Sequence, residues 1–375
     1  MQVLHIITGL GVGGAEAMLL KFLQASAPYV KASVISLTAG GENRPRIEAL
    51  GVPVFSLDLP QGRIPTFSTI RRLRERVRAV APDVIQGWMY HGNLAATASA
   101  HFAQGAPRVY WNVRQTIYDL RREPRLTRSV IRLCAFLSSG VDAIIYNSGL
   151  SRQQHESLGY AKRLSRLIPN GFDLDVWRPD PTARAAVRAE WQIPPDAVVV
   201  GQIARFHPMK GHHRLIEAAA QLQTRTAPYF MLAGKGLDAG NTELRGVLSD
   251  YALEDRFRLI GERSDIPRVM SALDILVSPS EWGEGFPNIL GEAMSAGVPC
   301  VATSIGDSAA VVGEEGRIVP PGDVTALAHA IEDLAGLTPQ QRRQLGQRAR
   351  ERIRDRFSLD QVTGEYLRLY RGDTA

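Results

Sequence analysis

Two acidic side chains lie before and within one short predicted helix. Glu284 precedes this helix and Glu292 lies eight residues later, within it. Eight residues is a little over two turns, so Glu292 can lie on the same side as the helix start. Carboxylates accept hydrogen bonds from sugar hydroxyls, and the free N–H groups near Asn288 favour an anionic ligand such as a phosphate. The spacing fits equally well a capped helix with Glu284 in its first turn and Glu292 on its solvated face.

Two basic side chains follow another predicted strand, residues 198–203. They are Arg205 and Lys210, in a loop at the carboxyl edge of the predicted sheet. Arginine can bind two phosphate oxygens at once and lysine supplies a mobile positive charge, so the pair suits a diphosphate. A solvated basic loop is the alternative, but its occurrence in the same domain as Glu284 favours ligand binding.

A glycine-rich loop lies between the predicted strand 3–7 and a helix over residues 15–25. Gly9, Gly11 and Gly14 match the dinucleotide-binding fingerprint. That fingerprint also requires an acid at the end of the second strand, and residues 32–38 end without one. The pattern therefore disfavours a nicotinamide-dependent oxidoreductase and indicates a loop whose backbone can approach another ligand. Glycines that end later strands, such as Gly234, are weaker signals of the same kind.

Few residues could hold a metal ion. His91 follows the predicted strand 83–86, and a lone histidine is more often a structural hydrogen-bonding group than a catalyst. Asp173 and Asp175 form an Asp-x-Asp sequence in a Pro- and Gly-rich stretch, where we expect turn chemistry. No other spacing of His and Cys suits a metal, so we expect no metal site.

The composition is that of an ordinary globular protein. Of 375 residues, 45% are hydrophobic and 22% charged, and 44 basic against 38 acidic residues give a net charge of +6. This mild excess permits anionic substrates or a membrane surface. Cys134 and Cys300 stand far apart in apolar contexts, as reduced core residues of a cytoplasmic protein do. We expect neither a membrane-spanning segment nor a signal peptide.

The order of the predicted elements indicates an α/β protein with two doubly wound, Rossmann-like domains. Strands alternate with helices in both halves, and a turn-rich stretch around residues 167–181 separates them. The predicted strands are 3–7, 32–38, 52–57, 83–86, 108–113 and 142–147, then 198–203, 229–233, 257–261, 275–277 and 299–302. The expected domain boundaries give an N-terminal domain over 1–168, a linker over 169–196, a C-terminal domain over 197–358 and a final segment over 359–375.

Taken together, these motifs resemble the GT-B fold glycosyltransferases of family 4, the large retaining family. The resemblance covers nearly the whole chain, and the pair Glu284 and Glu292 is its most specific signature. Its other motifs are residues 13–16, 168–173, Arg205 with 210–211, 234–236 and 285–299. It implies two domains facing each other across a cleft that holds the active site, with the final helix crossing back to the N-terminal domain.

The resemblance also implies roles for matching positions. Arg205 and Lys210 would neutralise the departing diphosphate, with Glu284 as a further catalytic group holding the transferred sugar. Glu292 would bind the ribose hydroxyls. Further donor-binding positions would be Gly13, Gly14, Gly234, Arg263, Gly285, Phe286, Asn288 and Ile289.

One position departs from the family pattern. Arg114 stands where many relatives have a functional histidine, which places it on the acceptor or phosphate side. His91 is the nearer candidate for a catalytic imidazole on the donor side, and the sequence does not show whether it takes that role.

The resemblance implies a retaining glycosyltransferase that needs neither metal nor cofactor. The favoured donor is a UDP-sugar, and the acceptor is a glycan or a lipid-linked molecule in cell-surface polysaccharide biosynthesis. A GT-B nucleotide-sugar epimerase and a catalytically silent sugar-nucleotide-binding subunit remain alternatives. We expect no nucleic-acid partner and a cytoplasmic location.

Arginine placement suggests a peripheral contact with the anionic inner face of the cytoplasmic membrane. One group lies on the predicted helix 66–80 and a second in and before another helix. The groups are Arg71, Arg72, Arg74, Arg76 and Arg78, and Arg121, Arg122, Arg125, Arg128 and Arg132. Two solvated helices are the alternative reading, and for the first group it is equally strong.

Overall fold

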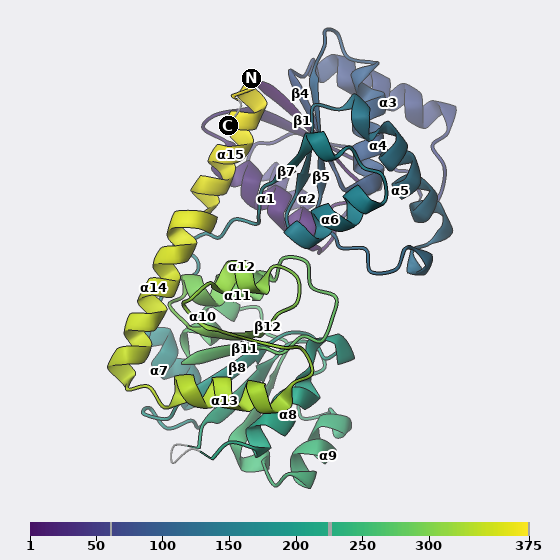
Figure 1. Cartoon of the computed structure of the whole chain (residues 1–375). Coiled ribbons are helices and arrows are strands. Elements are labelled where there is room, and N and C mark those ends of the chain that lie inside the picture. The colour runs from purple at the N-terminus through teal and green to yellow at the C-terminus, as the bar shows by residue number, and fades with distance from the viewer. Residues whose placement is uncertain (61, 224–226, 374–375) are drawn as a thin grey trace. The chain divides into compact units, whose positions relative to one another are not determined.

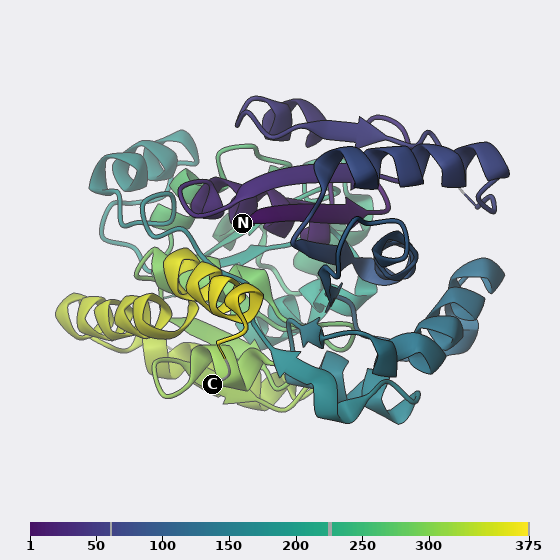
Figure 2. The same cartoon turned by 90° about the horizontal axis from the view of Figure 1, so that it is seen from above.

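The chain forms two compact units in a computed structural model that describes residues 1–60, 62–223 and 227–373 (Figures 1 and 2). The first unit comprises Met1–Gly171 and Leu359–Ala375, and the second comprises Phe172–Ser358. Each contains one parallel sheet covered by helices on both faces, which confirms the predicted pair of doubly wound domains. The last two residues of the predicted segment 359–375 lie outside the described residues.

The first sheet has the strand order β3-β2-β1-β4-β5-β6-β7, with every neighbouring pair parallel. Its strands are β1 Gln2–Ile7, β2 Lys31–Ser36, β3 Val54–Ser56, β4 Val84–Trp88, β5 Arg108–Val113, β6 Ala143–Tyr146 and β7 Ser165–Leu167. Its helices are α1 Gly14–Ser26, α2 Arg44–Glu48, α3 Phe67–Val80, α4 Met89–Ala100, α5 Arg125–Leu137, α6 Gly149–Ser157 and α15 Leu359–Arg371.

Two apolar clusters cover the faces of this sheet. Helices α1, α2 and α15 contribute to one cluster, and α3, α4 and α5 contribute to the other. The C-terminal helix α15 is an integral part of this unit, since the ring of Tyr366 lies 5.0 Å from that of Phe22 in α1. The Tyr366 hydroxyl also accepts a hydrogen bond of 2.9 Å from the Asn112 side chain at the end of β5.

The second sheet has the order β10-β9-β8-β11-β12-β13 and is also parallel. Its strands are β8 Val199–Ile203, β9 Tyr229–Ala233, β10 Phe257–Gly261, β11 Ile275–Ser278, β12 Cys300–Thr303 and β13 Arg317–Val319. Its helices are α7 Pro181–Glu190, α8 His212–Ala220, α9 Thr242–Asp250, α10 Ile266–Ser271, α11 Asn288–Ser295, α12 Ser308–Val312, α13 Val324–Ala335 and α14 Pro339–Phe357. Helices α7, α10, α11, α12 and α14 share one core cluster, and α8, α9 and α13 share the other.

Several local features differ from the sequence-based expectation. The range 169–196, expected to link the domains, contains α7, whose Val187 is fully buried in the core of the second unit. The three-residue strands β7 and β13 and the five-residue helix α2 were not expected, because such short segments show no full hydrophobic period. The spacing of Ile70, Leu73, Val77 and Val80 predicts an inward apolar stripe on the helix 66–80, but in α3 Ile70 is 44% exposed and Thr69 is buried in its place.

Both cysteines are buried and free, as expected. Across the described residues, no helix combines the length and apolar character that a membrane crossing requires.

Candidate active site

The second sheet has its topological switch point between β8 and β11. The chain continues from β8 to β9 on one side, and β11 leads to β12 on the other. Figure 1 shows β8, β11 and β12 next to one another. Connections that leave adjacent strands in opposite directions open a crevice beyond the carboxyl ends of those strands. The loop with Arg205 and Lys210 follows β8, and the loop with Glu284 follows β11. The topology therefore brings the two predicted loops together.

A pocket of about 760 Å³ lies at this switch point. It gathers the predicted residues Arg205, Lys210, Glu284, Phe286, Asn288, Ile289 and Glu292. Another part of the pocket wall is formed by Trp177, Ser264, Ile266 and Pro267. The volume is in the range of small-molecule sites in proteins.

The two loops are joined by backbone contacts. The Glu281 N–H donates to the Met209 carbonyl at 2.9 Å. Gly211 has a φ of +66°, and a Cβ there would overlap the Pro279 carbonyl oxygen, so only glycine allows this approach. The Gln202 side-chain amide at the end of β8 donates to the Lys210 carbonyl at 2.6 Å. These contacts hold Lys210 next to the loop after β11.

Lys210 and Glu284 form the central polar contact of the pocket. The Lys210 Nζ lies 2.5 Å from Glu284 Oε1, and both side chains are mostly shielded from solvent. The Ser280 hydroxyl donates to the same carboxylate oxygen at 2.8 Å, and the Thr303 hydroxyl donates to the Ser280 carbonyl at 2.6 Å. A lysine ammonium has three N–H donors, so this arrangement orients the group and leaves donors for a ligand.

Two residues of this network were not identified from the sequence. Ser280 orients Glu284, and Gln202 supports Lys210. The position of Ser280 could have identified it, because this residue lies two residues after the end of β11 and four residues before Glu284. Gln202 is a buried polar residue within an apolar strand, and such a residue usually has a specific hydrogen-bond partner.

Arg205 differs from Lys210 in its surroundings. It is exposed, and it has no ion-pair partner within residues 1–60, 62–223 and 227–373. With Arg205, Lys210, Glu284 and Glu292, the pocket carries two positive and two negative side chains. Because Glu284 already pairs with Lys210, Arg205 is the cation most accessible to an incoming anion.

Helix α11 begins at the pocket. Pro287 precedes Asn288 at the helix start, and Leu290 and Met294 anchor the opposite side in the core. The first N–H groups of a helix and its macrodipole favour an anionic group at that end. Glu292 lies one turn further along α11 and lines the same pocket, as the eight-residue spacing predicts.

The other predicted donor residues of the second unit surround the pocket without lining it. Gly234 at the end of β9 has a φ of +144° and packs directly on the Ala204 carbonyl. The Gly285 carbonyl accepts a hydrogen bond from the Asp307 N–H at 2.9 Å. The Arg263 side chain is directed to Asp265 and Glu190, at 2.8 and 2.5 Å, while the following Ser264 lines the pocket. Hydrogen bonds from Arg263 lower the pKa of the Asp265 carboxyl.

Three predicted residues lie at the switch point of the first sheet, between β1 and β4. Gly13 and Gly14 start α1 after β1, and His91 lies in the first turn of α4 after β4. Burial lowers the pKa of His91 below its usual 6.5, because desolvation favours the neutral imidazole.

Arg114 is held in a hydrogen-bond network of the first unit. Its guanidinium donates to the Asn112 side chain at 3.0 Å and to the Tyr366 hydroxyl at 2.9 Å. It also donates to the Asn170 side-chain oxygen. The network connects the end of β5 with α15, which gives Arg114 a structural role in this unit.

Asp173 accepts hydrogen bonds from the backbone N–H groups of Asp175 and Val176 at 2.9 and 3.2 Å. This is the turn chemistry expected of the Asp-x-Asp sequence. No group of three or more His, Cys, Asp or Glu side chains suited to a metal ion occurs in the described part of the chain.

Two family models match this chain in succession. The model for Glycosyltransferase Family 4 matches residues 12–176, and the model for Glycosyl transferases group 1 matches residues 194–336. The chain belongs to the group 1 glycosyltransferases. The predicted resemblance to this family is thereby confirmed.

Two bacterial proteins are among the curated relatives of this glycosyltransferase. It is 28% identical over 324 residues to the putative glycosyltransferase EpsF of Bacillus subtilis, covering 80% of this chain and 78% of EpsF. It is 32% identical over 232 residues to the lipopolysaccharide core biosynthesis glycosyltransferase LpsE of Rhizobium meliloti. That match covers 61% of this chain and 64% of LpsE, just under two thirds of the relative.

Solved structures support the GT-B fold of this glycosyltransferase. HepE of Anabaena in complex with UDP matches with a TM-score of 0.84 at 23% identity, covering 99% of this chain and all of HepE. HepE in complex with UDP-glucose matches with a TM-score of 0.79 at 22% identity over the same shares of the two chains.

Proposed function

We propose that this glycosyltransferase moves a sugar from a UDP-sugar to a glycan or lipid-linked acceptor, with retention at the anomeric carbon and without a bound metal. The observation that carries the proposal is the meeting of Arg205, Lys210, Glu284 and Glu292 in one pocket at the switch point of the second sheet. The binding of UDP and UDP-glucose by HepE supports the choice of donor. The name of LpsE supports an acceptor in cell-surface polysaccharide biosynthesis.

In the proposed donor complex, Glu292 accepts hydrogen bonds from the ribose hydroxyls and Glu284 from the transferred sugar. The Ser280 hydroxyl supports this role of Glu284, because it fixes the carboxylate before the sugar arrives. The base lies towards the wall formed by Ser264 and Ile266, next to Arg263.

Arg205 and Lys210 act on the leaving group. Breaking the bond between sugar and diphosphate places additional negative charge on the diphosphate oxygens. Preorganised positive groups stabilise this charge without reorganisation during the reaction. Lys210 is positioned by Glu284 and Gln202, and Arg205 is accessible for a two-pronged contact with phosphate. The N-terminus of α11 adds a partial positive charge.

His91 serves the N-terminal side of the reaction. Its lowered pKa supports a neutral imidazole, which can donate one hydrogen bond and accept another. Arg114 is the weaker candidate for this role, because three partners already hold its guanidinium.

The proposed membrane contact uses one face of α5 together with the exposed Arg121 and Arg122, which precede this helix. The side chains of Arg125, Arg132, Leu133 and Phe136 are exposed, and Phe136 is 82% exposed. Their spacing of three, four and seven residues puts them on one side of the helix. An exposed face that combines arginine with large apolar side chains suits an anionic lipid surface. Arg128 does not join this face, because it donates to the Arg121 and Glu123 carbonyls.

The decisive experiment has two steps. A thermal-shift screen with UDP, GDP, ADP and their sugars identifies the donor, because a ligand that binds only the folded state raises the melting temperature. Release of free UDP is then measured with and without acceptor, in excess chelator. We expect acceptor-dependent release and a glycosylated product of retained anomeric configuration.

The alternatives give different results in the same assays. An epimerase would consume the donor without any acceptor, and a silent subunit would bind the nucleotide without turnover. A strict requirement for Mg²⁺ or Mn²⁺, or the absence of any stabilisation by nucleoside diphosphates, would contradict the proposal.

A further inference from the structure

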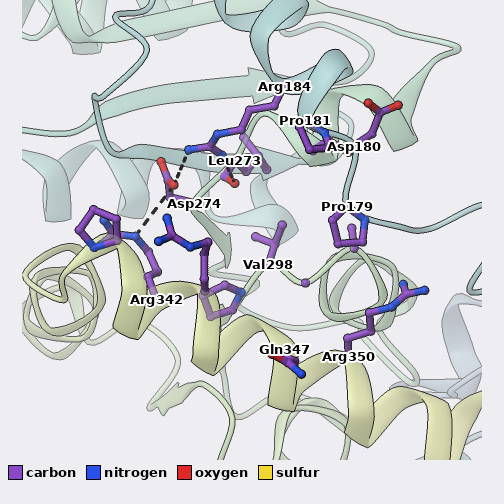
Figure 3. A pocket seen from close by; sticks show the side chains of 16 residues that line it. Pro179, Asp180, Pro181, Arg184, Leu273, Asp274, Val298, Arg342, Gln347 and Arg350 are labelled. Carbon is purple, nitrogen blue, oxygen red and sulfur yellow. Dashed lines mark hydrogen bonds and ion pairs between the residues drawn. The ribbon is translucent and has the colours of Figure 1, made fainter.

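A second pocket lies at the opposite edge of the second sheet. Its volume is about 470 Å³ (Figure 3). Asp274 immediately precedes β11, Pro299 immediately precedes β12, and both line this pocket. The start of α7 and the α14 residues 342, 343, 347 and 350 form further parts of its wall. In a parallel sheet, this amino edge is separated from the carboxyl edge by the length of the strands, so the pocket is distinct from the proposed donor site.

Positive side chains outnumber negative ones around this pocket. Four arginines line it, and the acids in its wall are Asp180 and Asp274. The arginines are Arg184, Arg342, Arg343 and Arg350. Asp180 caps α7 through a hydrogen bond of 2.8 Å to the Ala183 N–H. The donor pocket, by contrast, balances two cations with two acids.

Asp274 is shared by three guanidinium groups. Its carboxylate lies 2.7 Å from Arg184, 2.7 Å from the deeper Arg188 and 3.9 Å from Arg342. Figure 3 shows Arg184 and Arg342 directed at Asp274 from different elements. One carboxylate neutralises one cation, so two positive charges of this cluster are not compensated by Asp274.

Burial makes this excess charge energetically important. The side chains of Arg188 and Arg342 are 3% and 8% exposed. Burial lowers the pKa values of both guanidinium groups, because desolvation disfavours their charged form. Charges that have lost part of their hydration gain more from an anion than charges in water do.

The backbone holds these guanidinium groups in place. Arg342 donates to the Leu334 and Ala335 carbonyls at 2.7 and 3.0 Å, at the end of α13. Arg350 donates to the Trp177 and Leu174 carbonyls at 2.6 and 2.9 Å. The guanidinium groups are therefore ordered before any ligand binds, which reduces the entropy cost of binding.

Arg343 adds a charge that is not committed elsewhere. It is exposed and lines the pocket, and it pairs with no acid in the part of the chain that the structure describes. Apolar side chains form the remaining walls. They are Pro179, Pro181, Leu273, Val298, Pro299 and Pro339. The pocket thus offers both a cationic region and an apolar surface.

We propose that this arginine pocket binds a small phosphorylated molecule, with its phosphate near Arg184, Arg342 and Arg343 and its organic part against the proline-rich wall. Arginine is suited to phosphate because its planar N–H donors match two oxygens at once. This second site goes beyond the proposed transfer reaction and does not depend on it.

The test measures binding of phenyl phosphate to the full chain by isothermal titration calorimetry at low ionic strength. We expect saturable binding of phenyl phosphate and no binding of phenol, which has the same ring without the charge. Arg343→Glu should weaken binding by at least about tenfold, because a charge-assisted hydrogen bond is lost and a repulsive charge is added. Gln347→Glu, which places an acid in the same wall, should weaken it in the same direction.

Two controls locate the binding. Arg348→Glu changes another exposed arginine of α14 that does not line the pocket, so its dissociation constant should equal that of the unchanged protein. Arg205→Ala removes the accessible cation of the donor pocket and should also leave the constant unchanged. Loss of binding in Arg205→Ala but not in Arg343→Glu would assign phenyl phosphate to the donor pocket and overturn the proposal. Equal weakening by Arg343→Glu and Arg348→Glu, or no saturable binding up to about 10 mM, would also overturn it.

Discussion

The two units have the same architecture, but different side chains lie at the carboxyl edges of their sheets. In the second unit, the switch point carries Arg205, Lys210, Glu284 and Glu292, with Lys210 and Glu284 paired at 2.5 Å. In the first unit, the corresponding position carries glycines and His91, whose pKa is lowered by burial. A doubly wound sheet supplies a crevice in both cases, and the side chains decide whether that crevice suits a charged ligand.

The surroundings of the two edges explain this difference. Gly92 in the first unit packs so tightly on the Ile6 carbonyl that a Cβ would collide with it. Arg114 nearby is held by amide and hydroxyl groups. In the second unit, two loops meet at Gly211 and leave charged groups facing the pocket. Close backbone packing at glycine occurs at both edges, and the second edge differs by the charged side chains that line its pocket.

The largest effect should come from the cations of the second unit. Lys210→Ala should lower turnover by about 10²–10³-fold, because one preorganised contact to the departing charge is lost. Arg205→Lys keeps the charge but loses the two-pronged contact, so its loss should be smaller than that of Arg205→Ala. Steady-state kinetics with the identified UDP-sugar measure both. Unimpaired turnover in the double variant Arg205→Ala, Lys210→Ala would remove the proposed distinction between the two edges.

The next effect concerns the surface of the first unit. Exchanging Arg121, Arg122 and Arg125 for Glu should weaken binding to anionic vesicles by at least about 10²-fold, since each basic residue near such a surface contributes about 1 kcal/mol. Co-sedimentation at rising salt measures this, and binding should fade as salt screens the charges. Neutral vesicles and the α14 variant Arg348→Glu are the controls. Equal sedimentation of the triple variant and the unchanged protein would indicate a soluble acceptor instead.

A smaller effect should separate the two acids of the donor pocket. Glu292→Ala should weaken UDP binding by about tenfold, because hydrogen bonds to a charged group are lost. Glu284→Ala should leave UDP affinity nearly unchanged and lower turnover, since its proposed partner is the sugar. Calorimetric titration with UDP and kinetics with the UDP-sugar distinguish the two effects. If both variants bind UDP and turn over donor normally, the acids have only structural roles.

The last effect concerns pH and compares the cores of the two units. Burial lowers the pKa of His5 to about 3 and that of His155 to about 4 in the first unit, and that of His212 to about 4 in the second. Each native pKa is below the unfolded value of 6.5, so the unfolded state binds more protons between the two values. The stability contributed by each neutral histidine is complete above pH 6.5. It decreases as the pH falls towards the native pKa, by up to about 1.4 kcal/mol per pH unit.

Hydrogen exchange at pH 7 and pH 5, corrected for intrinsic rates, measures this effect for each unit. Two of these histidines lie in the first unit and one lies in the second. Protection should therefore fall more in β1 and α6, which carry His5 and His155, than in α8, which carries His212. His5→Leu should lower stability at pH 7, because Trp88 Nε1 loses its hydrogen-bond acceptor, and should also reduce the dependence on pH. An unchanged pH dependence in this variant would exclude His5 as a source of the effect.

The main strands were predictable from the sequence, and so was the position of the motifs in the loops that follow strands. Strands β5, β9 and β10 coincide with the predicted ranges, because short runs rich in apolar and aromatic residues and bounded by turn residues are strong local signals. The exposure of Ile70 was not predicted, because the position of a helix relative to its neighbours depends on contacts distant in sequence.

The sequence by itself determined the doubly wound class, the family and some of the residues that line the pocket at the switch point of the second sheet, among them Arg205, Lys210, Glu284 and Glu292. These follow from local periodicity and from motifs whose spacing along the chain is short. Only the tertiary structure decided which partners those residues have. Lys210 meets Glu284 across 74 positions of the chain, and Arg342 meets Asp274 across the second unit. Such pairings depend on how the loops and helices pack, and no local pattern encodes them. For the same reason, the arginine pocket at the amino edge became visible only in three dimensions, because its walls come from α7, α14 and the segments before β11 and β12.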